Sequence, residues 1–111
     1  MSDVFKFAQL NFHRSNAPSI LFDRYCLLEK IDFALFQEPH SYNGVVTGLK
    51  RGTVEVDRRF VSPRAGVLIK NGHKYMVLNE FCSRDVMTIS VQCISELQHT
   101  FLVIIFYLLN S

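Results

Sequence analysis

The segment that most restricts the fold of this chain is Asp32-Phe33-Ala34-Leu35-Phe36-Gln37-Glu38-Pro39. It is a short, aromatic-rich apolar run that ends in an amide, a carboxylate and a proline, which predicts a buried strand over residues 32–37. A buried strand of an α/β sheet delivers its last residues to the carboxyl edge, where such folds bind ligands. Glu38 stands at that position. The alternative is that Glu38 is a solvated residue at a strand end, as most glutamates are.

A second strand precedes this one in the chain. Residues 4–11 alternate apolar and polar side chains and end in the amide of Asn11, and apolar residues recur at helical spacing over 17–30. A strand-helix-strand unit makes its two strands parallel, with a right-handed crossover. We therefore expect Asn11 and Glu38 to emerge at the same edge of one sheet, within reach of one site.

The turn before the helix is polar. Ser15 or Asn16 can cap the helix, and Pro18 suits its first turn. His13 lies in the same turn, where it is either a ligand or a plain surface residue.

A long Gly-rich segment follows the second strand, over residues 40–52. Loops of this length in a compact domain tend to be functional. Its Lys50 and Arg51 are candidates for contacts with phosphate, and Tyr42 for stacking on a substrate or hydrogen bonding to it. A solvated loop fixed by its tyrosine is an equal alternative.

The rest of the chain has the pattern of antiparallel strands. We expect weak strand character over 53–61 and a clear strand over 64–70. Asn71-Gly72, a strong hairpin signal, should join that strand to a returning one over 73–78. Further strands are predicted over 85–92 and over 100–109, with a turn at 95–98 between them. The last strand is so apolar that it should be central and covered on both faces.

These elements predict an α/β chain with a mixed, largely antiparallel sheet and a helix on one face. A sheet that stops after a central strand leaves apolar surface uncovered, so we expect the chain to be part of a larger domain.

Composition leaves the class of partner open. The chain has 111 residues, 49% of them hydrophobic, with 12 Lys and Arg against 10 Asp and Glu. A net charge of +2 neither indicates nor excludes a nucleic-acid partner.

Three cysteines without close pairing fit neither a disulfide framework nor a zinc site, so an intracellular protein is expected. No signal peptide is evident, and the apolar run 101–109 is too short to span a bilayer, which needs about 20 residues.

Several segments together resemble the N-terminal part of the endonuclease/exonuclease/phosphatase superfamily, most closely the apurinic-endonuclease-like domain of non-LTR retrotransposon reverse-transcriptase polyproteins. The resemblance covers residues 4–92, whereas 93–111 form a divergent terminal strand. The matching pieces are Ala8-Gln9-Leu10-Asn11-Phe12-His13-Arg14, Ile31-Asp32-Phe33-Ala34-Leu35-Phe36-Gln37-Glu38-Pro39, Ser62-Pro63-Arg64-Ala65-Gly66-Val67-Leu68-Ile69 and Cys82-Ser83-Arg84-Asp85-Val86.

The resemblance implies the N-terminal part of a four-layered, DNase I-like α/β sandwich that cleaves phosphodiesters with Mg²⁺ or Mn²⁺. The matching glutamate, Glu38, would be a metal ligand, and the matching Asn11 would orient the metal-bound groups. Mg²⁺ typically takes one or two protein carboxylates and keeps several waters, which suits such a site. Family members of this type nick double-stranded DNA to prime reverse transcription, so the partner would be DNA and the compartment the nucleus.

The later motifs of the family are absent. Neither its Asp-x-Asn segment nor its Ser-Asp-His segment occurs, and His99 does not match the latter. The missing C-terminal half, or the reverse-transcriptase part of a parent polyprotein, would have to supply water activation. General acid–base catalysis contributes typically 10²–10⁴-fold, so we expect little or no nuclease activity from this chain alone. The alternatives are a non-catalytic fragment that binds DNA or a protein, with Lys50-Arg51 and Arg58-Arg59 as phosphate contacts, and an unrelated α/β domain.

Overall fold

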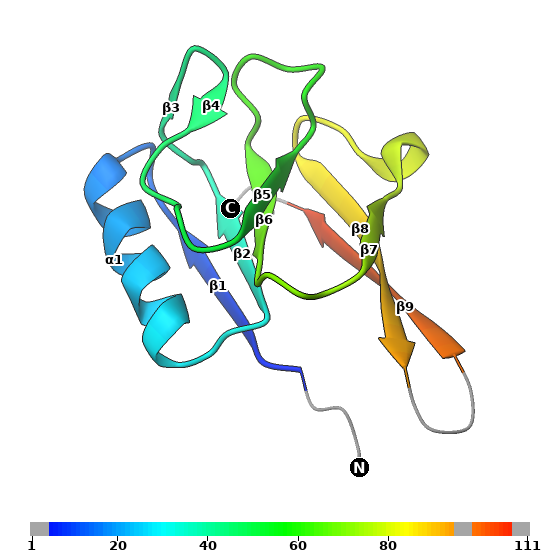
Figure 1. Ribbon diagram of the computed structural model, residues 1–111. Coiled ribbons are helices and arrows are strands. Elements are labelled where there is room, and N and C mark those ends of the chain that lie inside the picture. The colour runs from blue at the N-terminus through cyan, green and yellow to red at the C-terminus, as the bar shows by residue number, and fades with distance from the viewer. Residues whose placement is uncertain (1–4, 95–98, 108–111) are drawn as a thin grey trace.

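The computed structural model describes residues 5–94 and 99–107 (Figure 1). Its elements in chain order are β1 (Phe7–Asn11), α1 (Asn16–Leu28), β2 (Phe33–Gln37), β3 (Ser41–Tyr42), β4 (Val45–Val46), β5 (Thr53–Val56), β6 (Ala65–Ile69), β7 (Tyr75–Val77), the 3₁₀ helix η1 (Asn79–Phe81), β8 (Val86–Ile94) and β9 (His99–Tyr107). The β-α-β start and the α/β class follow the prediction.

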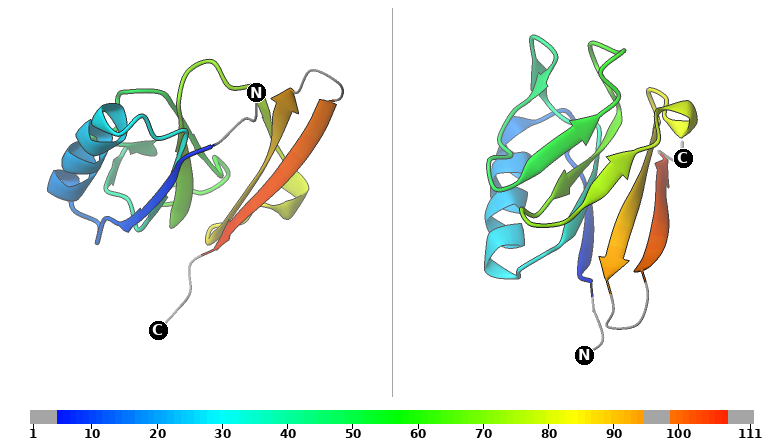
Figure 2. Two further views of the ribbon diagram at one scale, coloured as in Figure 1. Left: turned by 90° about the horizontal axis from the view of Figure 1, so that it is seen from below. Right: turned by 45° about the vertical axis from the view of Figure 1, so that its right-hand side comes forward.

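Three layers are built by the described residues. Helix α1 covers one face of a four-stranded sheet of order β1-β2-β6-β5, and a three-stranded sheet of order β7-β8-β9 lies on the other face (Figures 1 and 2). A short β3–β4 hairpin stands apart from both sheets. The four-stranded sheet is mixed, because β1 and β2 are parallel whereas β2–β6 and β5–β6 are antiparallel.

Strand β2 is buried because its alternating side chains serve two cores. Ala34 and Phe36 face the helix side, where they join a core with Phe12 and Phe22. Phe33 faces the second sheet, in a core whose other members include Val67, Ile69, Met87, Ile89 and Val91. The prediction of a buried strand here is confirmed.

The predicted hairpin at Asn71-Gly72 is wrong. The chain does turn there, with Gly72 at φ 104°, but β6 and β7 belong to different sheets. Strand β6 already has β2 on one side and β5 on the other, so it offers no free edge. Strand β7 pairs with β8 instead, and the turn carries the chain from one sheet to the next.

Two other expectations about strands need correction. Strand character over 53–61 stops at Val56, because Asp57 turns the chain: its carboxylate accepts a 3.1 Å hydrogen bond from Arg59 N, and its carbonyl accepts one of 3.2 Å from Phe60 N. The last strand, β9, pairs with β8 along its whole length and is an edge strand of the described sheet, not a central one. The predicted turn at 95–98 lies outside the described residues.

Candidate functional site

Asn11 and Glu38 lie at the same end of two adjacent parallel strands, as predicted. Asn11 is the last residue of β1 and is in register with Gln37, the last residue of β2. The pairing continues beyond the strands, because Phe12 N donates to Gln37 O at 2.8 Å and Arg14 N to Glu38 O at 2.8 Å. We call this place, formed by residues 11–14 and 37–39, the carboxyl edge.

The backbone of Glu38 is held in a left-handed conformation, with φ 49°. Its N–H donates to Arg64 O at 2.9 Å, and its carbonyl accepts from Arg14 N, so both of its peptide groups are fixed. His13 and Arg14 opposite it also have positive φ, 51° and 57°. Such a conformation costs a non-glycine residue about 1–2 kcal/mol, and backbone strain of this kind gathers at functional sites.

The Glu38 side chain is half-buried and makes no hydrogen bond or ion pair with any other described residue. The carboxamide oxygen of Asn11 accepts a 2.8 Å hydrogen bond from His13 N, which fixes this side chain beside the strand end. The carboxyl edge therefore combines an oriented amide with a carboxylate that has no protein partner among the described residues.

A third segment, which the sequence analysis matched to the family without giving it a role, supports the edge from the second sheet. Arg64 N donates to Arg84 O at 2.8 Å, and Arg64 Nε lies 3.3 Å from Asp85 Oδ1 as an ion pair. Since Arg64 O receives the Glu38 N–H, this pair links the end of β2 to the approach to β8. The sequence signal that could have predicted this contact is the basic Arg64 in one matched piece and the acidic Asp85 in the other. The exposed Arg14 was likewise missed as a cation next to Glu38.

Tyr42 lies in the β3–β4 hairpin, at the end of the sheet where α1 begins (Figure 1). The hairpin is tied to the helix start, because Thr47 Oγ1 hydrogen-bonds to Asn16 Oδ1 at 2.6 Å and to His40 Nδ1 at 2.8 Å. Tyr42 is 71% exposed as a whole residue, so it is accessible to a ligand at this end. Its substrate-binding role stays a prediction.

Lys50 and Arg51 are not brought to the same place. Both of their backbone N–H groups donate to Asp23 Oδ1. The two residues come just before β5, whose first residue, Thr53, pairs with Ile69 at the end of β6. Ile69 in turn pairs with Phe33, the first residue of β2. That is the end where β2 begins. Five residues of strand at about 3.3 Å each separate it from Glu38 by roughly 16 Å. Phosphate contacts by Lys50 and Arg51 stay a prediction, at a distance from the carboxyl edge.

Arg59, of the second basic pair, is occupied by internal contacts. Its guanidinium hydrogen-bonds to both Asp57 oxygens and, at 2.8 Å, to Cys82 O. These bonds lower the pKa of Asp57 below its usual value of 3.8. Arg58 is exposed and makes a long, 3.5 Å contact with Val54 O, so of the two it is the better candidate for a ligand contact.

The described residues contain no group of three or more His, Cys, Asp or Glu side chains that could hold a metal ion. The carboxyl edge nonetheless suits a hard, hydrated cation. Glu38 is a half-buried carboxylate without a protein partner in the described part of the chain, and Mg²⁺ commonly binds through one or two carboxylates and keeps its waters.

Comparison with known proteins bears on the fold. No family model matches the sequence, and no curated protein matches it. Among solved structures, the endonuclease domain of TRAS1, a telomere-specific non-LTR retrotransposon, is similar with a TM-score of 0.63 and 13% sequence identity. The chain has the fold of part of an endonuclease domain. The match covers 94% of this chain and 44% of that one, so the chain spans less than half of the neighbour's length.

Helix α1 has 13 residues, and no helix in the described ranges is long and apolar enough to cross a membrane.

Proposed function

We propose that this chain supplies the metal-binding half of a Mg²⁺- or Mn²⁺-dependent site that cleaves phosphodiesters in double-stranded DNA. Its similarity to part of the fold of a retrotransposon endonuclease domain supports the proposal. The observation that carries the proposal is the carboxyl edge: Asn11 is oriented by His13 N, and Glu38 is held in a strained backbone conformation with a carboxylate that no described residue uses. We also propose that the chain is part of a four-layered, DNase I-like sandwich of the endonuclease/exonuclease/phosphatase superfamily.

Each residue of the proposed site would have a distinct task. Glu38 would hold the metal ion, which when bound polarises the phosphate and stabilises charge on the leaving oxygen. The Asn11 amide would orient the groups around the ion by hydrogen bonding. The exposed Arg14, whose backbone is bonded to Glu38, would contact a phosphate, and the exposed Tyr42 would stack on a base or donate a hydrogen bond to it.

The β1 edge of the four-stranded sheet favours pairing with a strand from further polypeptide. Strand β1 pairs with β2 and with no other described strand, and Phe7 and Leu10 on it are 45% and 40% exposed. An open, apolar strand edge is a template for further strands. The C-terminal half of such a domain, or the reverse-transcriptase part of a parent polyprotein, would bring the base that activates water, and the nucleus would be the place of action.

A plasmid-nicking assay tests this function. We expect the chain alone to convert supercoiled to open-circular plasmid slowly, at least about 10²-fold below a complete enzyme because the general base is missing. The residual Mg²⁺-dependent nicking should vanish in Glu38→Gln and persist in Glu80→Gln, a matched change at an exposed glutamate on η1. Nicking that is equal in Glu38→Gln would refute the assignment of Glu38.

A second function, DNA binding without cleavage, is favoured by basic side chains that the fold leaves exposed, among them Arg14, Lys50 and Arg58. These cations would neutralise phosphates. Because such contacts release counterions, affinity for a short duplex should fall steeply as salt rises from 50 to 200 mM. Salt-dependent binding with no Mg²⁺-dependent nicking at all would support this function over the first, and salt-independent binding would exclude it.

A further inference from the structure

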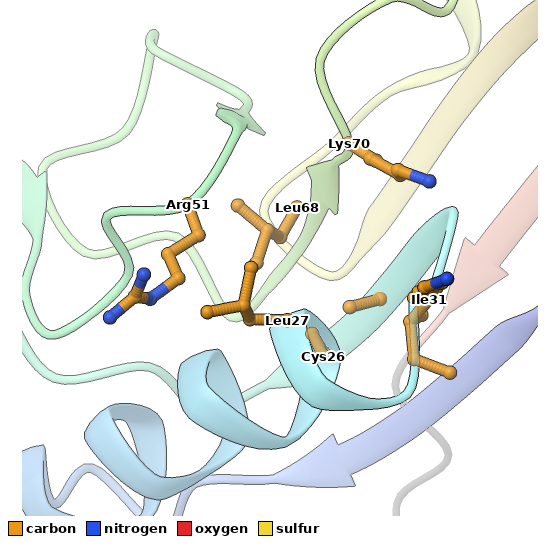
Figure 3. Close-up of a pocket in the computed structure, with 8 residues that line it drawn as sticks. Cys26, Leu27, Ile31, Arg51, Leu68 and Lys70 are labelled. Atoms are coloured by element: carbon orange, nitrogen blue, oxygen red, sulfur yellow. The ribbon is translucent and has the colours of Figure 1, made fainter.

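A pocket of about 360 Å³ lies at the end of the sheet away from Glu38, between the last turn of α1 and strands β2 and β6 (Figure 3). Its apolar lining includes Cys26 from the last turn of α1, Ile31 from the turn that follows, and Ala34 and Leu68 from the sheet. All four residues are at most 8% exposed as whole residues, so the floor is part of the helix-side core. Figure 3 shows Leu27 of the helix facing Leu68 of the sheet, with Arg51 on one side and Lys70 on the other.

The rim of the pocket is cationic. It carries Lys30, Arg51 and Lys70, which come from three separate segments of the chain. The side chains of Lys30 and Lys70 make no hydrogen bond or ion pair with any described residue. Arg51 Nε lies 3.5 Å from Asp23 Oδ2, and half of that side chain is still exposed.

Two of the carboxylates near this end, Asp23 and Asp32, are engaged in hydrogen bonds. Asp23 also accepts the backbone N–H groups of Lys50 and Arg51, and Asp32 accepts from Lys6 N and lies 2.8 Å from His73 Nε2. The Cys26 thiol adds no negative charge, because burial and, secondarily, Asp23 raise its pKa to about 11. The pocket therefore has an apolar floor, a positive rim and no free carboxylate in its lining.

From this charge and shape complementarity we propose that the pocket, here called the basic pocket, binds a small molecule with an apolar body and a single anionic head, such as a medium-chain carboxylate. Its volume is at the lower end of the range of small-molecule sites, about 300–1,000 Å³, which suits a short chain better than a nucleotide. The apolar body fills the space over Ala34 and Leu68, and the head meets Lys30 and Lys70. The inference is independent of the function proposed for Glu38.

Three probes that differ in the head alone test the proposal: octanoate, octanol and octylammonium, titrated into the ¹⁵N-labelled chain. We expect octanoate to shift the amide signals of Cys26, Ile31 and Leu68 and to bind more tightly than octanol, with octylammonium weakest. Equal binding of octanoate and octanol, or shifts centred elsewhere, would overturn the proposal.

A pair of charge-reversed variants separates the pocket from a general charge effect. Lys70→Glu should weaken octanoate binding roughly two- to thirtyfold, because an exposed charge pair contributes about 0.2–1 kcal/mol and the reversal replaces an attraction by a repulsion of similar size. Lys74→Glu makes the same change in net charge at an exposed lysine outside the pocket lining and should leave binding unchanged. Both substitutions are on the surface, so both variants should fold, and equal loss in the two would refute a specific site.

Discussion

The left-handed backbone of Glu38 makes a prediction that is independent of any assay of activity. At φ 49°, Glu38 carries a conformational penalty that glycine does not, about 1–2 kcal/mol. Glycine in turn costs about 0.5–1 kcal/mol relative to alanine through the freedom it loses on folding. Glu38→Gly should therefore be more stable than Glu38→Ala by about 0.5–1 kcal/mol, the reverse of the usual order in a regular element.

A matched pair at Gln9 supplies the reference. Gln9 is an exposed residue within β1 and is not among the residues of positive φ. There the glycine variant should be the less stable of the two by about 0.5–1 kcal/mol. The difference between the two comparisons isolates the left-handed penalty of about 1–2 kcal/mol.

Urea unfolding followed by circular dichroism, without divalent metal, measures all four variants. With a slope of about 1–3 kcal/mol per molar urea, a difference of about 1 kcal/mol moves the midpoint by roughly 0.3–1 M. If Glu38→Gly proved less stable than Glu38→Ala by the amount seen at Gln9, the left-handed strain at the carboxyl edge would not exist and the reasoning built on it would fail.

Three further predictions concern packing and ionisable groups elsewhere in the fold. Gly66→Ala places a Cβ 2.4 Å from Cζ of Phe36, whose ring is already stacked on Phe12. It should lower the free energy of unfolding in urea by about 1–3 kcal/mol. Phe36→Leu makes room for the new Cβ, so the losses of the two substitutions should be less than additive in the double variant. Because Arg59 lowers the pKa of Asp57, the Asp57 carboxylate stabilises the fold above pH 3.8, and this stability is lost as the pH falls through the lowered pKa. Asp57→Asn should therefore flatten the decrease of the urea unfolding midpoint between about pH 5 and 2. The same decrease in the variant and in the unchanged chain would contradict this. Burial and, secondarily, the hydrogen bond to Glu55 raise the pKa of Tyr75 to about 12. Tyr75→Phe should therefore remove a component with a pKa near 12 from the absorbance titration of the tyrosines. Loss of a component with a pKa near 10.0 would contradict this.

The sequence predicted the carboxyl edge well because its determinants are local. The apolar run that forms β2 is bounded by Pro39, and a helix between two strands favours their parallel pairing, so the sequence alone predicted that Asn11 and Glu38 lie together. The positive φ of Glu38 was not predictable, since no glycine marks it and the conformation is imposed by Arg14 and Arg64 from other segments.

The pairing of strands was harder to predict. The Asn71-Gly72 turn was recognised, but a local turn signal does not say whether the preceding strand has a free edge, and β6 has none. The place of Arg51 was also missed. A basic pair in a Gly-rich loop predicted a phosphate contact without a position in the fold, and the long-range bonds of its backbone to Asp23 hold it at the end of the sheet opposite Glu38.

Paramagnetic broadening by Mn²⁺ tests the central claim, that Glu38 is a metal ligand, most directly. In the ¹⁵N-labelled chain, substoichiometric Mn²⁺ should broaden the amide signals around the carboxyl edge, including those of Asn11, Arg14 and Arg64, and excess Mg²⁺ should restore them. Glu38→Gln should abolish the effect and Glu80→Gln should leave it intact. Broadening that is spread over exposed carboxylates, or that persists in Glu38→Gln, would contradict the account.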